Sequence, residues 1–176
     1  MQKYFRISFI AGLISASVSF IYFVGSNLFG INPLGGSKAF GYILMVIMFF
    51  PALWYFRKNY LNNEMHFHQA FVIAFLMNLF TCLLFSLFIW IDLSLIDPNL
   101  FVRHVTESKL FFSSIKDDFI KTNSLDAFNI SLASLDKLTI GDIVFDEFKK
   151  RFLIISFFVL LVSFVMRRSP SWAVSK

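Results

Sequence analysis

Two histidines stand close together at a boundary between polar and apolar sequence. His66 and His68 flank Phe67, and Glu64 lies two residues before the first of them. On an extended segment, residues two apart share one face and could bind a metal ion together, whereas on a helix they do not face each other. No cysteine or aspartate lies near enough to complete a four-ligand set. We therefore interpret the segment as an ordinary polar loop and predict no metal site and no bound cofactor.

A second group of polar residues lies inside a long apolar run, residues 70–91. The group shares one broad helical face and consists of Asn78, Thr81, Cys82 and Ser86. A buried asparagine in a bilayer should find a partner on another helix, in a contact of roughly 0.6–2 kcal/mol. We interpret the group as polar contacts between helices. The alternative is a path for a substrate or ion, but such paths usually carry an ionisable group at mid-membrane, and we find none here.

The carboxylates gather elsewhere, between residues 97 and 151, where they are interleaved with basic residues. Such interleaving is typical of a solvated helical face. His104 stands alone in the same segment, and we expect it to be solvated. The chain contains no nucleophile elbow, no H-E-x-x-H, no P-loop and no G-x-G-x-x-G pattern. We therefore predict that the chain is not an enzyme and name no catalytic residue.

The elements that carry these residues are those of an integral membrane protein. Of the 176 residues, 57% are hydrophobic and only 15% are charged, against roughly a quarter in a typical soluble domain. Four apolar blocks predict an all-α, four-helix membrane bundle in one domain, with helices at 7–29, 39–56, 70–91 and 152–166. The first block is too long for the core of a signal peptide, so we expect an uncleaved anchor. The fourth is short, and we expect the basic residues 149–151 to extend outward from its start and lengthen it.

The charges of the short connections predict the orientation of the chain. Basic residues lie before the first block, after the second and after the fourth, as Lys3, Arg6, Arg57, Lys58, Arg167 and Arg168. Because basic residues mark the cytoplasmic side, both termini are predicted to be cytoplasmic. The net charge of +5 then reflects topology. It does not indicate nucleic-acid binding, because no basic face with stacking aromatic residues occurs outside the blocks.

The long connection at residues 98–150 is predicted to form an amphipathic helical cap on the extracytoplasmic side. Its apolar residues recur at helical spacing, as Phe101, Val105, Phe112, Ile115 and Phe119. Thr139 and Asp142 form a capping pattern, which predicts that the last helix starts near Ile140 and runs into the membrane. The apolar face of the cap needs a partner, which could be lipid headgroups, a second copy of the chain or another protein.

Small residues follow one side of the first block. They are Ser8, Gly12, Ser15 and Ser19, at spacings of four, three and four. A stripe of this kind lets a second helix backbone approach closely. We favour packing inside the chain, because a four-helix bundle needs such a seam, and contact with another subunit is the alternative.

Several soft motifs give the chain a familiar layout. They are a Gly/Ser-bearing first helix at residues 11–15, an aromatic-basic exit from the second helix at 54–58, a Phe-rich entry to the third at 65–71, and the long charged segment before the last helix. In this layout the chain resembles a family of small four-helix bacterial inner-membrane proteins, catalogued only as a domain of unknown function. The resemblance implies a bacterial inner-membrane location and a four-helix architecture. It implies no activity.

Function is expected to follow from binding rather than from chemistry. Catalytic motifs and a mid-membrane ionisable group are missing, while the predicted cap is large. We therefore expect a non-enzymatic scaffold or accessory subunit that binds a membrane-protein partner through its helices and its cap. The alternative is a small transporter or channel component that works as a homo-oligomer, with Asn78, Thr81 and Ser86 along the path. A membrane enzyme comes third.

Overall fold

The computed structural model describes residues 2–36 and 38–167, and this part of the chain is helical throughout, with short turns and no strand. The helices, in chain order, are α1 (Gln2–Leu28), α2 (Lys38–Tyr60), α3 (Phe67–Ile91), the π-helix η1 (Asp92–Ile96), α4 (Pro98–Ser114), α5 (Lys116–Thr122), α6 (Leu125–Asp136) and α7 (Ile140–Met166). The predicted all-α class is confirmed.

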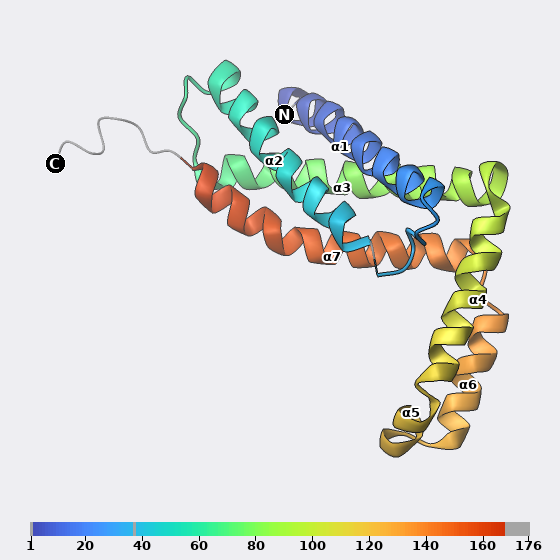
Figure 1. Cartoon of the computed structure of the whole chain (residues 1–176). Coiled ribbons are helices and arrows are strands. Elements are labelled where there is room, and N and C mark those ends of the chain that lie inside the picture. The colour runs from blue at the N-terminus through green and yellow to red at the C-terminus, as the bar shows by residue number, and fades with distance from the viewer. Residues whose placement is uncertain (1, 37, 168–176) are drawn as a thin grey trace.

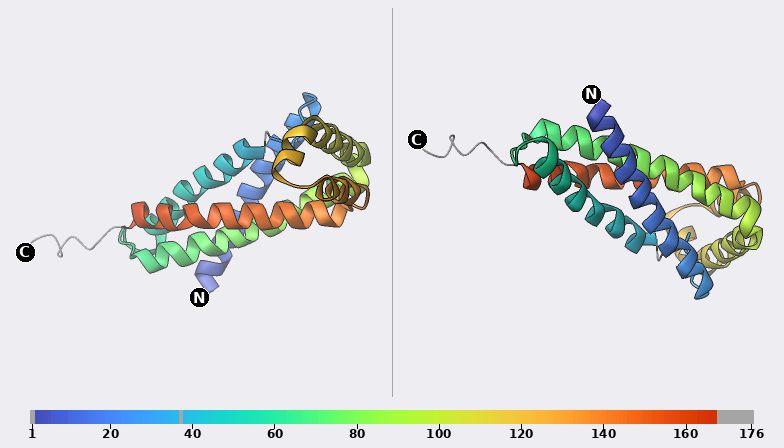
Figure 2. Two further views of the ribbon diagram at one scale, coloured as in Figure 1. Left: turned by 90° about the horizontal axis from the view of Figure 1, so that it is seen from below. Right: turned by 90° about the horizontal axis from the view of Figure 1, so that it is seen from above.

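The helices form an L-shaped molecule (Figure 1). Its long limb is a bundle of α1, α2, α3 and α7, in which α3 packs on both α1 and α7. Its short limb, which we call the arm, consists of α4, α5 and α6 and turns away from one end of the bundle. The two further views also show α3 and α7 side by side, with α1 crossing them (Figure 2). We call the two ends of the bundle the arm end and the N-terminal end.

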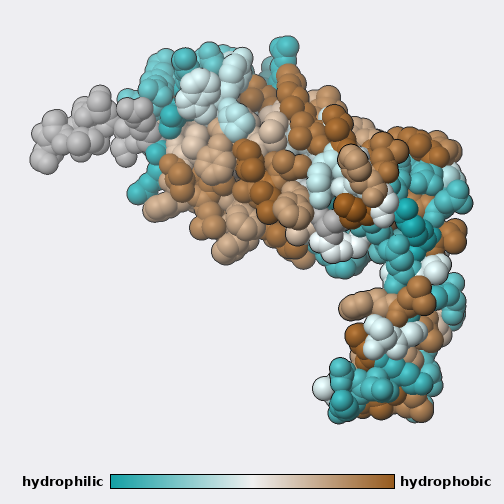
Figure 3. Space-filling view, viewed as in Figure 1, coloured by the Kyte–Doolittle hydropathy of each residue, from teal (hydrophilic) through white to brown (hydrophobic). Residues whose placement is uncertain are grey.

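Three helices of the bundle are long and apolar enough to cross a membrane. They are α1, α2 and α3 together with η1. The flank of the bundle is covered with hydrophobic residues, while hydrophilic residues collect at its ends and along the arm (Figure 3). This distribution is that of a membrane protein, because apolar side chains can face lipid tails without cost.

The first three helices begin before the predicted blocks, and α2 also ends beyond its block. The first three were predicted at 7–29, 39–56 and 70–91, and α1 and α2 each extend beyond these limits by several polar or aromatic residues. The block limits follow hydropathy, whereas a helix continues through polar residues until its backbone turns away. The last helix, predicted to span at 152–166, starts at Ile140 as its capping pattern indicates, and runs unbroken to Met166.

Local sequence explains where the chain turns. The Thr139 hydroxyl accepts a hydrogen bond from the Asp142 amide, and the Asp142 carboxylate accepts one from the Thr139 amide, which closes a capping box at the start of α7. At the corner between bundle and arm, the Asp97 carboxylate accepts from the Leu100 amide, and Pro98 occupies the first turn of α4. Proline fits there because the first helical turn needs no amide donor.

The small-residue stripe of α1 lies against α3 of the same chain. Ser8 donates to the carbonyl of Ile73 at 3.0 Å, and Thr81 donates to the carbonyl of Gly12 at 3.4 Å. Gly12, Ser15 and Ser19 are also buried. A Cβ atom at position 12 would lie only 2.8 Å from the Cβ of Phe80. The close approach of α1 to α3 therefore depends on glycine at this position.

This contact makes a matched pair of substitutions informative. Gly12→Ala should lower the thermal stability of the detergent-solubilised protein by about 1–3 kcal/mol, because the added methyl group forces the two backbones apart. Gly25→Ala, in the same helix, places its methyl group where no atom lies within 4 Å and should leave stability unchanged or slightly higher. Equal melting temperatures for the two variants would contradict the assigned packing.

Candidate functional site

Three charged side chains meet between the helices near the arm end of the bundle. The guanidinium Nε of Arg151 lies 3.2 Å from Oε2 of Glu147, and the Lys38 ammonium lies 3.0 Å from Oε1 of the same carboxylate. Arg151 and Glu147 are only 2% and 3% exposed. We call these three residues the ionic cluster. It joins the first turn of α2 to the middle of α7, with one carboxylate shared between two cations.

Two expectations from the sequence are wrong at this point. Arg151 was expected to extend outward, and Glu147 was assigned to a solvated helical face. Glu147 and Arg151 are one helical turn apart and share the side of α7 that faces α2 and α3. Their neighbours Asp146 and Lys150 form the solvated ion pair, at 2.6 Å, on the exposed side of the same helix.

Aromatic rings and a glycine enclose the guanidinium group of Arg151. Its central carbon lies 4.0 Å from the ring centroid of Phe85 and 4.7 Å from that of Tyr42. A Cβ at Gly41 would stand 3.3 Å from Nη1 of the arginine, so the glycine leaves room for it. Planar guanidinium groups stack well on aromatic faces, which partly replaces the hydration that burial removes. The arginine is thus held by three helices at once.

The polar residues predicted on α3 lie in the bundle interior, but they face different neighbours. Asn78 donates from Nδ2 to Ser156 Oγ at 3.1 Å and to the Phe152 carbonyl at 3.3 Å, both on α7. Thr81 donates to α1 instead. Ser86 is buried, and among the described residues its hydroxyl has no hydrogen-bond partner. This arrangement is that of contacts between helices, with Asn78 bonded to α7 and Thr81 bonded to α1.

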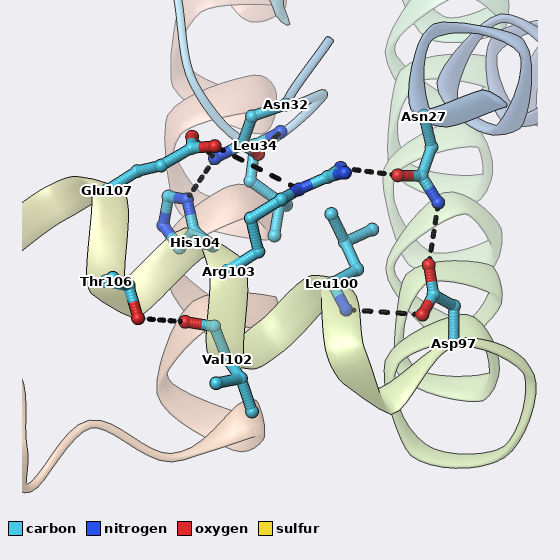
Figure 4. Close-up of polar contacts among 10 residues, drawn as sticks. All are labelled: Asn27, Asn32, Leu34, Asp97, Leu100, Val102, Arg103, His104, Thr106 and Glu107. Carbon is cyan, nitrogen blue, oxygen red and sulfur yellow. Dashed lines mark hydrogen bonds and ion pairs between the residues drawn. The ribbon is translucent and has the colours of Figure 1, made fainter. Parts of the chain in front are cut away.

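A polar network fixes the arm to the turn between α1 and α2 (Figure 4). Asn27, in the last turn of α1, donates to the Asp97 carboxylate at 2.9 Å and accepts from the Arg103 guanidinium. Asn32, in the turn, donates to Glu107 Oε2 at 2.7 Å. Both asparagines therefore reach across to α4 or its cap. The bonded residues are 70 or more positions apart in the sequence, so the network joins two distant segments. It therefore holds the arm at its angle to the bundle.

His104 belongs to this network, which corrects its expected solvation. Its Nδ1 lies 3.2 Å from Nδ2 of Asn32, and the side chain is half-buried. Burial lowers the pKa of His104, and the nearby Lys38 ammonium lowers it further. Lys38 thus lies beside both the ionic cluster and the polar network of the arm. The ionic cluster and the polar network are therefore coupled electrostatically through Lys38 at the corner of the L.

The apolar residues predicted for the cap mostly contact other residues of the same chain. Phe112 stacks on Phe128 of α6 with ring centroids 4.9 Å apart, and Phe119 meets both rings edge-on. Phe101 packs against the bundle core. Val105 and Ile115, the other two residues of the predicted face, are also partly buried. Three residues of the predicted face, Phe101, Phe112 and Phe119, therefore find their partners in the bundle or in α6.

A different set of apolar residues remains uncovered on the arm. Phe111 is 68% exposed and Leu110 is 66% exposed, although the next residue, Phe112, is partly buried. Val102 of α4 and Ile130 of α6 are exposed to a similar degree. We call these four residues the exposed arm residues; they lie on more than one side of the arm, because Val102 and Phe111 are nine positions apart on α4. The sequence pattern missed them because α4 is apolar on more than one side.

The two histidines of the α2–α3 connection are placed at the N-terminal end of the bundle. His66 precedes α3, and its amide donates to Gln69 Oε1 at 2.9 Å. The rings of His66 and His68 lie parallel, with centroids 5.8 Å apart. Within residues 2–36 and 38–167, no cluster of three or more His, Cys, Asp or Glu side chains forms that could hold a metal ion.

Comparison with known proteins identifies the family. Residues 8–168 match the model of a family described as a protein of unknown function (DUF4199). The chain belongs to this family. The resemblance seen in the sequence is confirmed, and the matched range includes the whole ionic cluster and the arm. No curated protein and no solved structure matches the chain.

The ionic cluster and its solvated neighbour allow a controlled test. Glu147→Gln leaves Arg151 and Lys38 without a counter-charge inside the protein and should destabilise the fold by about 3–5 kcal/mol. Asp146→Asn removes a carboxylate with the same spacing from an exposed pair and should cost less than about 1 kcal/mol. Thermal or denaturant unfolding of both variants in one detergent measures the difference. A Glu147→Gln protein as stable as Asp146→Asn would mean that the ionic cluster does not hold the bundle.

Proposed function

We propose that the chain is a non-enzymatic scaffold or accessory subunit of a larger membrane complex. The observation that carries the proposal is the arm. It is held at the corner by a polar network, it extends from the bundle, and it leaves large apolar side chains uncovered. A fixed element with uncovered apolar surface is suited to contact another protein.

In this proposal α7 is the fourth span. Its apolar part, residues 152–166, runs beside α3, and its charged part forms the ionic cluster at the arm end. The basic residues at the N-terminal end favour a cytoplasmic location for that end, with the arm outside the inner membrane. Because α1, α2 and α3 alternate in direction, the α1–α2 turn then lies on the same side as the arm, and the α2–α3 connection lies on the cytoplasmic side.

The L shape supports a specific arrangement for the complex. When the bundle axis lies along the membrane normal, the arm lies along the membrane surface. At a rise of 1.5 Å per residue, the 17 residues of α4 reach about 25 Å sideways. A membrane protein seated beside the bundle would lie under the arm and would meet the exposed arm residues on that side.

The ionic cluster has a structural role in this proposal. Its carboxylate is shared by two cations, and the arginine is enclosed by aromatic rings. Buried ion pairs of this kind help select one arrangement of the helices over others. Here it would hold the start of α2 against α7, and so keep these two helices at a fixed position relative to each other near the corner.

The second candidate, a small transporter that works as a homo-oligomer, is favoured by the same cluster. Ionisable groups inside a membrane bundle often mark a path for protons or ions. Glu147 and Arg151 are ionisable groups buried between the helices, although they lie near the arm end and not at mid-membrane. The scaffold remains the first proposal, because Asn78 and Thr81 bond to different helices and do not line one common channel.

Two neighbouring phenylalanines separate a binding role of the arm from a folding role. Phe111→Asp should leave the melting temperature unchanged, because the side chain is exposed, and should abolish co-purification of the partner in mild detergent. Phe112→Asp should lower the stability of the arm by several kcal/mol, because it breaks the aromatic contact with α6. A homo-oligomer without a foreign partner would support the transporter, and a monomer unaffected by Phe111→Asp would contradict the scaffold.

The proposed topology is tested by reporter fusions. A reporter that is active only in the cytoplasm should give signal when fused after Lys176. A reporter that is active only outside should give signal when inserted at Ser124, the cap of α6. If the C-terminal fusion is active only outside, then α7 does not cross and the protein has three spans.

A further inference from the structure

A groove runs between α1 and α2 at the N-terminal end of the bundle. It has a volume of about 720 Å³, and its walls are mostly apolar. Its side chains include Ile7, Ile10, Ile14, Met48, Ala52 and Met77. Ile10 and Ile14 are close to half exposed, so the groove opens sideways from the bundle rather than into a closed interior. In a membrane, this opening faces the lipid tails.

The length of the groove corresponds to one leaflet of a bilayer. On α1 the lining extends from Lys3 to Ile14, and on α2 from Met48 to Tyr60. At 1.5 Å per residue, each wall is about 17–18 Å long. Half of the hydrocarbon core of a bilayer is about 15 Å thick. An acyl chain that enters at the level of Lys3 would therefore end near the middle of the bilayer.

One end of the groove is basic. Lys3 and Arg6 contribute to its lining, and within the described part of the chain neither forms an ion pair with an acidic side chain. Arg57 and Lys58 lie in the last turn of α2, at the same end. Tyr55 and Tyr60 line the groove beside them, as is common at the level of lipid headgroups. An anionic group would find two free cations at the place where an apolar slot begins.

We propose that this groove binds one anionic phospholipid. An acyl chain lies between α1 and α2 with its end against Met77, and the phosphate pairs with Lys3 and Arg6. Basic pockets between membrane helices are a general means of selecting anionic headgroups. The apolar walls bury the acyl chain, and the two cations favour a lipid with a negatively charged headgroup. In the proposed orientation, the lipid belongs to the cytoplasmic leaflet.

Native mass spectrometry tests the proposal on the full chain. The probes are dioleoyl phosphatidylglycerol and dioleoyl phosphatidylcholine, added to the delipidated protein in detergent. One phosphatidylglycerol should bind per chain, in preference to phosphatidylcholine. The double variant Lys3→Gln/Arg6→Gln should weaken phosphatidylglycerol binding by roughly 10- to 30-fold, at about three- to fivefold per cation, and leave phosphatidylcholine unchanged. Ile10→Trp, which fills the slot, should weaken both lipids.

A charge-matched control excludes a general effect of net charge. Lys116→Gln/Lys137→Gln removes two cations of the arm, outside the groove, and should keep the preference for phosphatidylglycerol. Equal binding of the two lipids by the unaltered protein would overturn the proposal, as would an equal loss in the control. A dimer of the chain that carries no lipid would also overturn it, because the groove would then be covered by a second copy. All these outcomes are independent of the arm, so they do not depend on the proposed scaffold function.

Discussion

The structure depends on one carboxylate placed between two cations. Glu147 is nearly inaccessible to solvent, and it holds Lys38 at the start of α2 and Arg151 on its own helix. A buried arginine without such a partner would be strongly unfavourable, so the positions of α2, α3 and α7 are linked by the need to keep this contact. The Phe85 and Tyr42 rings complete the enclosure. Apolar packing alone would allow these helices to slide or rotate, since lipid tails are as apolar as the side chains between them.

The corner of the molecule continues the same polar region outward. Lys38 lies close to His104, which contacts Asn32 in the α1–α2 turn. From there the contacts extend through Glu107 and Arg103 along α4. The bundle and the arm are therefore joined by directional hydrogen bonds in addition to the apolar contact of Leu100 and Phe101 with the bundle core. Hydrogen bonds of this kind have preferred geometries, and so they set the angle of the L as well as its stability.

The sequence predicted those features that depend on residues near one another in the chain. The cap at Thr139 is a four-residue pattern, and the stripe that includes Gly12 has helical spacing. Both could be recognised without knowing the neighbouring helices. Asn78 was predicted to contact another helix, although the sequence could not say that the contact would be Ser156 of α7. In each case local periodicity carried the information.

The features that the sequence missed depend on contacts between distant segments. Two acidic residues followed by three basic ones at residues 146–151 look the same whether a helix is solvated all round or buried on one side. Only the neighbouring Gly41 and Phe85 show that Arg151 points inward. His104 has its partner 72 residues away, in a turn that shares no pattern with it. An i, i+4 Glu–Arg pair at the edge of an apolar run was the available signal, and it is a weak one.

The unbroken course of α7 has a mechanical consequence. Its 27 residues form a rod about 40 Å long, with the arm attached at Ile140 and the carbonyl of Met166 bound by Arg57 at the other end. Proline and glycine, the usual causes of a hinge, are absent from its interior after Gly141. A rod without a hinge transmits a tilt from one end to the other. A displacement of the arm therefore also moves the last turn of α7, so that the arm end and the N-terminal end of the bundle move together.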